Sequence, residues 1–185
     1  MDMDDARKLL QSRAGGRLFD HSRGVEESAC KLALTYGVDS AKASLAGLLH
    51  DYGKIYPHNV LRQIALEHSL GDELALQEPK LLHAPVGAWL LRHELGIEDE
   101  EILAAVRVHT TGAAGISPLA RIVYLADYIE PGRAYPGVDD LRKTAFVNLD
   151  RALLDALTRT IKYVLEREKV LHPDSISFRN SLILS

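Results

Sequence analysis

The sequence predicts an all-α fold, a single-domain bundle of helices. Apolar residues recur at helical spacing along nearly the whole chain. Runs of strictly alternating apolar and polar residues, which would indicate strands, are lacking. No repeat, low-complexity tract or long linker divides the 185 residues, of which 46% are hydrophobic, and this size and composition suit one core. We therefore expect one domain over residues 1–185.

The first two expected helices carry candidate functional residues near their ends. A helix over about 17–36 has an apolar face that ends at a glycine, and His21 lies at the edge of that face. A second helix over about 40–53 places His50 and Asp51 in its last turn. Neighbouring helical residues point about 100° apart, so both can reach one ion only where the helix is ending.

The middle of the chain places two more histidines on inner faces. A helix over about 58–70 is expected to end at a glycine. The next helix, over about 80–95, has His83 on the same face as its apolar residues. His109 follows the apolar spacing of the helix after it.

The C-terminal part combines one candidate ligand with scaffold. Ser117–Pro118 is a good N-cap and first-turn pair for a helix that carries Asp127 on its apolar face, and Pro131–Gly132 breaks that helix. Over 138–172 we expect a short helix and a long one that begins after Asn148. These helices carry no evident chemistry and are expected to be scaffold.

Composition excludes several classes of function. The 22 basic and 26 acidic residues leave a net charge of −4 without long runs of like charge, which argues against nucleic acid as a partner. No apolar run is long enough for a membrane span, and the N-terminus lacks the apolar segment of a signal peptide. The single cysteine, Cys30, fits a reducing compartment and is expected to be a small buried residue. A soluble, cytoplasmic protein is therefore expected.

Six ionisable residues converge on the inner faces or ends of five successive helices. A lone histidine on an apolar face is more often a hydrogen-bonded core residue than a ligand. Burying this many ionisable groups together, however, costs free energy unless a cation pairs with them. Imidazole and carboxylate donors without thiolate suit Fe, Mn, Co or Zn. The candidate metal ligands are His21, His50, Asp51, His83, His109 and Asp127.

The order of these residues resembles a known signature. His21, the His50–Asp51 pair and Asp127 resemble the H…HD…D pattern of the HD-domain metal-dependent phosphohydrolases. Longer segments resemble the YqeK family of symmetrical diadenosine tetraphosphate hydrolases over about 17–133, and HTTG and ADYIEPGR are the most family-specific pieces. The GYP tripeptide of the cyclic-dinucleotide phosphodiesterases is absent. The resembling segments are RLFDHSRGVEESACKLA, AGLLHDYGK, HAPVGAWLLRHELGI, VRVHTTG, LARIVYLADYIEPGR and the C-terminal FRNSL.

The resemblance implies a helical HD domain that cleaves diadenosine tetraphosphate into two ADP with two divalent metal ions. By this resemblance the first ion is held by His21, His50, Asp51 and Asp127. The second is held by His83, His109 and a bridging Asp51, which is also a catalytic residue. Iron is the first expectation for the metal, followed by manganese or cobalt.

Several polar residues are candidates for contact with the substrate's phosphates. Lys54, assigned as both catalytic and substrate-binding, follows His50 by one turn and would meet a phosphate as a point charge. Its alternative reading is a solvated lysine favoured at a helix C-terminus. Arg17 and Arg133 are nearly as compatible with surface roles, and the resemblance favours function. Thr110 and Thr111 add hydroxyl donors.

Two alternative functions stay open. The same site could act on nucleoside monophosphates, cyclic dinucleotides or a guanosine alarmone, which comparative turnover would separate. A metal protein that senses nucleotides without hydrolysing them ranks low, because all six expected ligands are intact. The sequence sets neither the preference for adenine over guanine nor the oligomeric state, and a homo-oligomer is compatible with it. The other histidines, expected at the surface or in loops, are His58, His68, His93 and His172.

Overall fold

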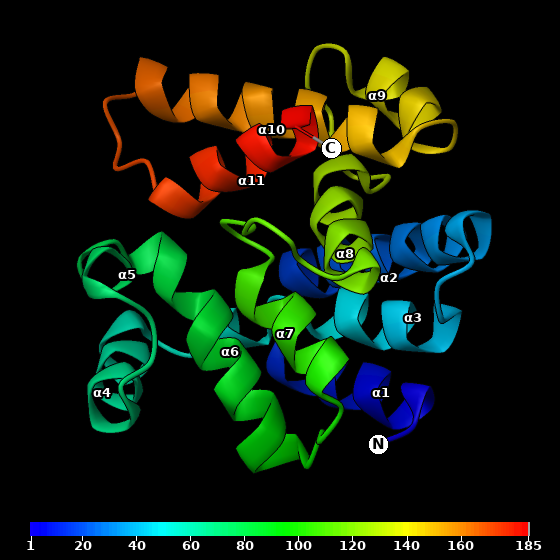
Figure 1. Cartoon of the computed structure of the whole chain (residues 1–185). Helices are drawn as coiled ribbons and strands as arrows, with labels where there is room; N and C mark the ends of the chain where they lie inside the picture. The colour runs from blue at the N-terminus through cyan, green and yellow to red at the C-terminus, as the bar shows by residue number, and fades with distance from the viewer. Residues whose placement is uncertain (185) are drawn as a thin grey trace.

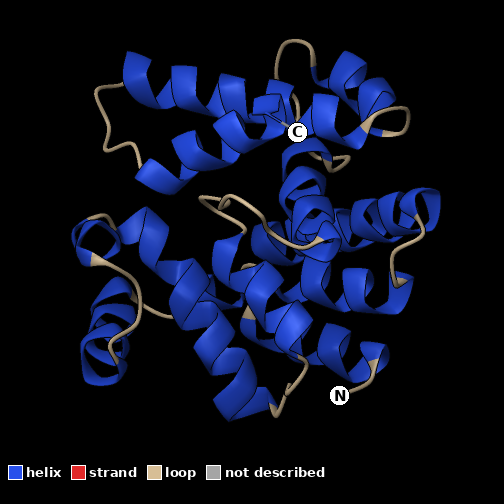
Figure 2. Ribbon diagram, viewed as in Figure 1, coloured by secondary structure: helices blue, strands red, loops and turns tan. Residues whose placement is uncertain are grey.

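The computed structural model describes residues 1–184, apart from the side chain of Pro79, and its regular elements are helices (Figures 1 and 2). The prediction of an all-α fold is confirmed. In chain order the elements are α1 Met3–Arg13, α2 Gly16–Tyr36, α3 Ser40–Leu49, the 3₁₀ turn η1 Tyr52–Ile55, α4 His58–His68, α5 Glu73–Gln77, α6 Pro79–Leu95, α7 Glu100–Val108, α8 Pro118–Ile129, α9 Val138–Ala145, α10 Leu149–Glu166 and α11 Pro173–Leu184.

Two predicted helix ends were wrong, and three helices were not predicted. The second helix ends at Leu49 instead of near Gly53, because the chain tightens into η1. α4 ends at His68 because Ser69 itself adopts the left-handed conformation that was expected at the following glycine. α1, α5 and α11 were missed. None of the described helices is long and apolar enough to cross a membrane.

Helix α8 lies at the centre of the molecule. It packs against α2 and α7, and α3 packs on both α2 and α7 (Figure 1). α6 lies along α7 and contacts η1, so it packs against the turn that follows α3. The helices α9, α10 and α11 lie at the other end of α8, in the upper part of Figure 1. The candidate ligands therefore come from elements that meet around α8.

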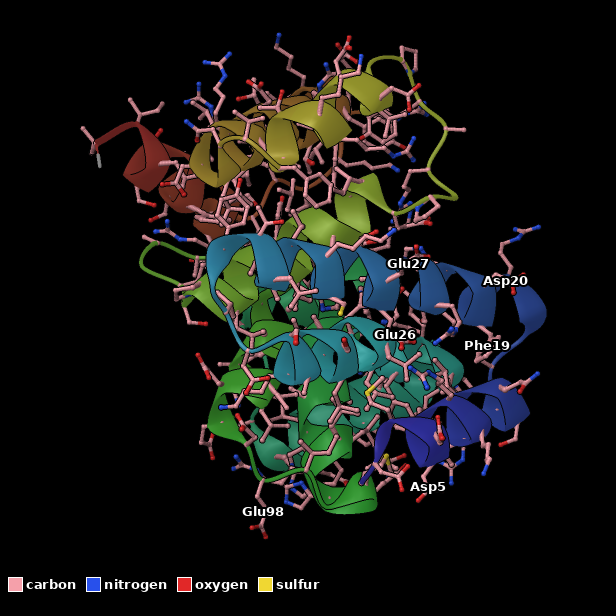
Figure 3. The ribbon with its side chains drawn as sticks, turned by 90° about the vertical axis from the view of Figure 1, so that its right-hand side faces the viewer. Asp5, Phe19, Asp20, Glu26, Glu27 and Glu98 are labelled. Atoms are coloured by element: carbon pink, nitrogen blue, oxygen red, sulfur yellow. The ribbon has the colours of Figure 1, made fainter. Side chains whose placement is uncertain are left out.

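Helix α1 is attached to α2 by a buried ion-pair network as well as by apolar contacts. Glu26 of α2 is only 5% exposed, and its carboxylate accepts hydrogen bonds from Arg7 of α1 and from Arg23. Figure 3 faces α1, α2 and α3 and labels Glu26 on α2. A buried carboxylate needs such partners, since an unpaired charge in the interior is costly.

Helix α11 is tied to the loop that follows α7. Phe178 is fully buried beside Gly112, where an added Cβ would lie 2.1 Å from the phenylalanine ring. The φ of Gly112 is +65°, so both the close approach of Phe178 and the left-handed backbone conformation require glycine there. Ser175 donates a hydrogen bond to the carbonyl oxygen of Thr111 at 2.9 Å. The HTTG and FRNSL segments, which are far apart in the sequence, are thus packed together.

His172 lies in the loop before α11, as one of the two expectations had it, but it is buried and not at the surface. Its side chain is 9% exposed, and its Nε2 lies 2.7 Å from Asp72 Oδ2, which links the start of α11 to the start of α5. His58, His68 and His93 are exposed, as expected. His68 and His93 stack on Trp89, with ring centroids 4.4 and 4.1 Å away. Cys30, expected to be buried, is partly exposed.

Candidate metal centre

The ring of His21 is oriented by a carboxylate behind it. His21 Nδ1 lies 3.1 Å from Glu130 Oε1, and Glu130 is 4% exposed. With Nδ1 engaged, Nε2 points into the cluster, 3.1 Å from Asp127 Oδ1 and 3.3 Å from His50 Nε2. A carboxylate behind a histidine is the arrangement that fixes the tautomer of a metal ligand.

His50 and Asp51 directly follow the end of α3 instead of forming its last turn. His50 Nδ1 donates a hydrogen bond to the carbonyl oxygen of Gly47 at 2.7 Å, which leaves the Nε2 lone pair free. Asp51 then departs from helical geometry, with φ −97° and ψ 15°, at the start of η1. This break brings Asp51 Oδ2 to 3.4 Å from His50 Nε2, so adjacent residues face the same point.

His83 and His109 form a second imidazole pair on α6 and at the end of α7. Their Nε2 atoms lie 3.1 Å apart. His109 Nδ1 donates to the carbonyl oxygen of Val106 at 2.7 Å, so its Nε2 is also free to act as a ligand. Burial lowers the pKa of His83 to about 4, which keeps this ring neutral at physiological pH.

Asp51 stands between the two imidazole pairs. Its Oδ2 faces His21 and His50, whereas its Oδ1 lies 3.2 Å from His83 Nε2 and 3.3 Å from His109 Nε2. Asp51 is 1% exposed, and its buried Oδ1 has no hydrogen-bond partner among the described residues. Burial acts to raise the pKa of Asp51, but the neighbouring imidazoles outweigh it, and the pKa lies well below its usual value.

The donor atoms fit divalent cations. Two sets of three donors each lie within 4.8 Å of one another, and Asp51 belongs to both: one set with His21 and His50, the other with His83 and His109. A buried carboxylate oxygen that faces imidazole nitrogens and has no hydrogen-bond partner would be stabilised by a bound cation. Nitrogen and oxygen donors without thiolate match the class of metal expected from the sequence.

Asp127 and Arg133 form the rim of the cluster. Asp127 is 26% exposed and lies 3.9 Å from His50 Nε2 as well as close to His21. Arg133 Nε donates to the Asp127 carbonyl oxygen at 2.9 Å, and its guanidinium pairs with the Asp127 carboxylate. Although burial acts to raise it, the pKa of Asp127 is strongly lowered, because His21, His50 and Arg133 lie beside the carboxylate.

Most of the candidate substrate residues gather beside this cluster. A cavity of about 650 Å³ is lined by Arg17, Lys54 and Arg133 together with His21 and Asp51. The Lys54 ammonium lies 2.7 Å from Asp51 Oδ2, and its side chain is 47% exposed. The cavity therefore has carboxylate and imidazole donors in its wall and three cations around them.

The two threonines of HTTG are placed differently. Thr110 Oγ1 lies 3.4 Å from His83 Nε2 and 3.3 Å from His109 Nε2, so it belongs to the cluster. The Thr111 hydroxyl instead donates to the carbonyl oxygen of Gly112 and lines a separate cavity with His172. The turn points successive side chains to different sides, so the structure does not bring Thr111 to the candidate phosphate site.

Sequence reasoning missed residues that shape the site. Glu130, which orients His21, lies within ADYIEPGR, and its role was not predicted. Two glycines permit close approaches: a Cβ on Gly24 would lie 2.6 Å from Glu130 Oε2, and one on Gly53 would lie 2.3 Å from the His83 carbonyl oxygen. Thr160 of α10 lines a cavity of about 450 Å³ together with His83 and His109, so the helix expected to be scaffold borders the site.

Comparison with known proteins identifies the family. The HD domain model matches residues 18–132. The chain is 39% identical to a symmetrical bis(5'-nucleosyl)-tetraphosphatase of Halalkalibacterium halodurans over 100% of this chain and 98% of the relative, and 37% identical to one of Bacillus subtilis over 99% and 98%. A crystal structure of a predicted HD superfamily hydrolase involved in NAD metabolism from Clostridium acetobutylicum superposes with a TM-score of 0.94 and 38% identity, covering 100% of this chain and 98% of that one. The chain belongs to the HD-domain family, in its group of symmetrical bis(5'-nucleosyl)-tetraphosphatases.

Proposed function

We propose that this chain is a metal-dependent phosphohydrolase that cleaves diadenosine tetraphosphate symmetrically into two ADP. One observation carries the proposal: a buried carboxylate, Asp51, lies between two imidazole pairs at the edge of a cavity lined by Arg17, Lys54 and Arg133. The names of full-length relatives in several bacteria support the choice of substrate. We expect the whole chain, residues 1–185, to act as one domain in the cytoplasm.

The proposal assigns the six donors to two ions. His21, His50, Asp51 and Asp127 hold one ion, and His83, His109 and Asp51 hold the other. Iron is the first candidate, with manganese and cobalt next. Bound divalent cations would supply a nucleophilic water at neutral pH and offset the negative charge of the phosphoryl oxygens. The Nδ1 contacts of His21, His50 and His109 keep these rings in the orientation that ligands need.

The cationic side chains account for cleavage at the centre of the tetraphosphate. Lys54 and Arg133 line the same cavity as Asp51, so they can neutralise the terminal phosphate of a leaving ADP. Arg17 extends this positive lining, and the Thr110 hydroxyl offers a hydrogen bond at the imidazole pair. A leaving ADP stabilised in this way favours breaking the central bridge over the outer ones.

Product analysis tests this function. Hydrolysis in ¹⁸O-labelled water should give ADP alone, with one labelled oxygen in half of the ADP molecules. Chromatography that shows ATP and AMP from the wild-type protein would refute the symmetrical reaction. Nucleoside monophosphates, cyclic dinucleotides and a guanosine alarmone serve as competing substrates in the same assay.

Elemental analysis tests the number of ions. Asp51→Ala should abolish activity and remove metal, since Asp51 is shared by both donor sets. His83→Ala and His109→Ala should each lower the metal-to-protein ratio from about two towards one by weakening the second ion alone. An unchanged ratio in both histidine variants would remove the second ion from the proposal. Asp20→Ala, whose carboxylate belongs to neither set, is the matched control.

A further inference from the structure

A cavity lined by tyrosines adjoins the candidate metal centre. It has a volume of about 590 Å³, which lies within the range of small-molecule sites. Its wall includes Tyr128 at the end of α8, Tyr135 of the following loop, and Tyr163 and Glu166 of α10. Aromatic walls with a few polar groups are typical of sites for flat organic ligands.

This tyrosine cavity is continuous with the site of the proposed reaction. Arg133 lines both the tyrosine cavity and the cavity that contains Lys54 and Asp51. Tyr128 and Thr160 line both the tyrosine cavity and the one that contains His83 and His109. A ligand whose phosphates lie at the cluster therefore has an adjoining space for its organic end.

The rings are held in different ways. Tyr135 donates a hydrogen bond to the carbonyl oxygen of Tyr128 at 3.0 Å, and their ring centroids lie 5.2 Å apart, so these two rings form a fixed wall. Tyr163 is 49% exposed and has the Arg167 guanidinium 4.5 Å from its centroid. The exposed part of the Tyr163 ring, which lines this cavity, leaves area for stacking.

The spacing of the cavity residues along α10 matches the length of a nucleoside. Thr160 borders the cluster's cavity, and Tyr163 and Glu166 lie about 4.5 and 9 Å further along the helix, at a rise of about 1.5 Å per residue. From the phosphate end outward, the side chains are therefore Arg133, the Thr160 hydroxyl, the Tyr163 ring and the Glu166 carboxylate. The carboxylate can accept a hydrogen bond from an exocyclic amine of the base.

The cavity on the other side of the cluster has a different character. It has a volume of about 810 Å³ and shares Arg17 and His21 with the cavity of Lys54. Its lining is charged and includes Asp20, Arg23 and Glu27, and it contains no tyrosine, phenylalanine or tryptophan. The two ends of a symmetrical substrate would therefore meet unlike surroundings.

We propose that the tyrosine cavity binds one nucleobase of the substrate, with Tyr163 as the stacking residue and Glu166 as the polar contact. The proposal rests on the proposed function for the placement of the phosphates at the metal centre. The enzyme then recognises one base by stacking in the tyrosine cavity, and the other base lies in the charged cavity. Specificity for the organic end then lies in α8, α10 and the loop between α8 and α9.

Equilibrium binding of ADP, the proposed product, tests this without turnover. Stacking of one base on an aromatic side chain is worth about 1–3 kcal/mol, so Tyr163→Ala should weaken ADP binding roughly 5- to 150-fold. Tyr163→Phe, which keeps the ring, should retain the affinity. Leu165→Ala is the matched control, because Leu165 is an exposed apolar residue on the same helix, outside the cavity. Inorganic tripolyphosphate, which has no base, should bind all four proteins equally.

The outcomes separate this inference from the proposed function. ADP affinity that is unchanged in Tyr163→Ala overturns the nucleobase site, even where the wild-type protein cleaves the dinucleotide. Equal weakening of ADP and tripolyphosphate also overturns it, since the loss would then concern phosphate. Binding of ADP that depends on Tyr163, in a protein that leaves diadenosine tetraphosphate intact, supports the site and refutes the reaction. Photolabelling with 8-azidoadenosine diphosphate should mark Tyr128, Tyr135 or Tyr163, and labelling confined to residues 16–27 would contradict the assignment.

Discussion

Lys54 occupies a position where a single charge serves two purposes. Its ammonium lies 2.7 Å from Asp51 Oδ2, and its half-exposed side chain also borders the cavity. The contact with a buried carboxylate argues against the reading of Lys54 as a merely solvated lysine. When a phosphate enters, the same ammonium is close enough to the cavity to turn towards it.

Lys54→Ala should slow hydrolysis of the dinucleotide by roughly one to three orders of magnitude, as expected for loss of one charge-stabilising donor. Metal content should stay intact, because lysine is not among the donors. Steady-state kinetics and elemental analysis of the same preparation check both statements. Lys31→Ala, which removes an exposed lysine of α2 that pairs with Glu27, is the control and should leave the kinetics unchanged. Unaltered kinetics in Lys54→Ala would show that Lys54 is a surface residue without a role in the reaction.

Glu130 acts on the cluster through His21. Glu130→Ala removes the acceptor at 3.1 Å from His21 Nδ1 and frees the ring to rotate. Loss of such an outer-shell partner typically lowers metal affinity or activity about 10- to 100-fold. Metal titration should show the loss at the ion held by His21, and Glu27→Ala, an exposed glutamate of α2 paired with Lys31, should leave the affinity unchanged. Equal affinity in wild type and Glu130→Ala would show that the orientation of His21 is set elsewhere.

At the scale of elements, the site depends on how tightly η1 is held against α6. Gly53 has the His83 backbone where its Cβ would be, so the turn that carries Asp51 and Lys54 is pressed against the helix that carries His83. On the other side of the turn, Tyr52 is buried, and its hydroxyl accepts a hydrogen bond from Arg13 of α1. Two helices, α6 and α1, therefore fix this short turn.

The start of α7 is held by Asp99, and the ionisation of this residue should make the free energy of unfolding depend on pH. Its carboxylate accepts from the backbone N–H groups of Glu101 and Ile102 and lies 2.9 Å from the Lys42 ammonium of α3. The hydrogen bond with Lys42 lowers the pKa of Asp99 against the opposing effect of burial. A folded pKa below the unfolded value of about 3.9 stabilises the protein above that pH, and the contribution is lost as the pH falls through the folded value.

Asp99→Ala should therefore lower the free energy of unfolding by about 1 kcal/mol at pH 7, the typical value of an N-cap. The difference from wild type should shrink as the pH falls below about 4. Asp99→Asn retains the cap and loses the ion pair, so it should lie between the two. Urea unfolding at several pH values measures this, and a difference that grows towards acid pH would contradict the assignment.

At the scale of the whole molecule, the six candidate ligands gather ionisable groups where the helices meet, and among them Asp51 Oδ1 is buried without a hydrogen-bond partner. Cations that bind only the folded chain should stabilise it by about 2.7 kcal/mol at 100 times the dissociation constant. For a chain of this length the midpoint of thermal unfolding should then rise by about 5–10 °C. Calorimetry with manganese, and again after chelation, tests the shift. An Asp51→Ala protein should show no such increase, and a wild-type protein indifferent to metal would contradict the assignment of the cluster.

The sequence predicted the helices that carry ligands better than those that do not. Apolar periodicity placed α2, and Gly37 and Gly96 as terminators fixed the ends of α2 and α6, so both helices were predicted to within a residue. α11 was missed because its apolar residues do not lie on one face, and its burial depends on Phe178 entering the space beside Gly112. Glu130 was missed for a related reason, since its role arises from contact with His21 on another helix.

The division of the chain between the metal centre and the tyrosine cavity has an evolutionary consequence. All six candidate ligands lie within residues 18–132, the stretch that the HD domain model matches, whereas Tyr135, Pro136, Arg159, Thr160, Tyr163 and Glu166 follow it. Mutations in the last third of the chain can reshape the cavity without altering a ligand. Such a molecule can diversify its choice of nucleotide while its reaction chemistry is inherited unchanged. Chimaeras joined near residue 133 would exchange the nucleotide preference and keep the metal ligands.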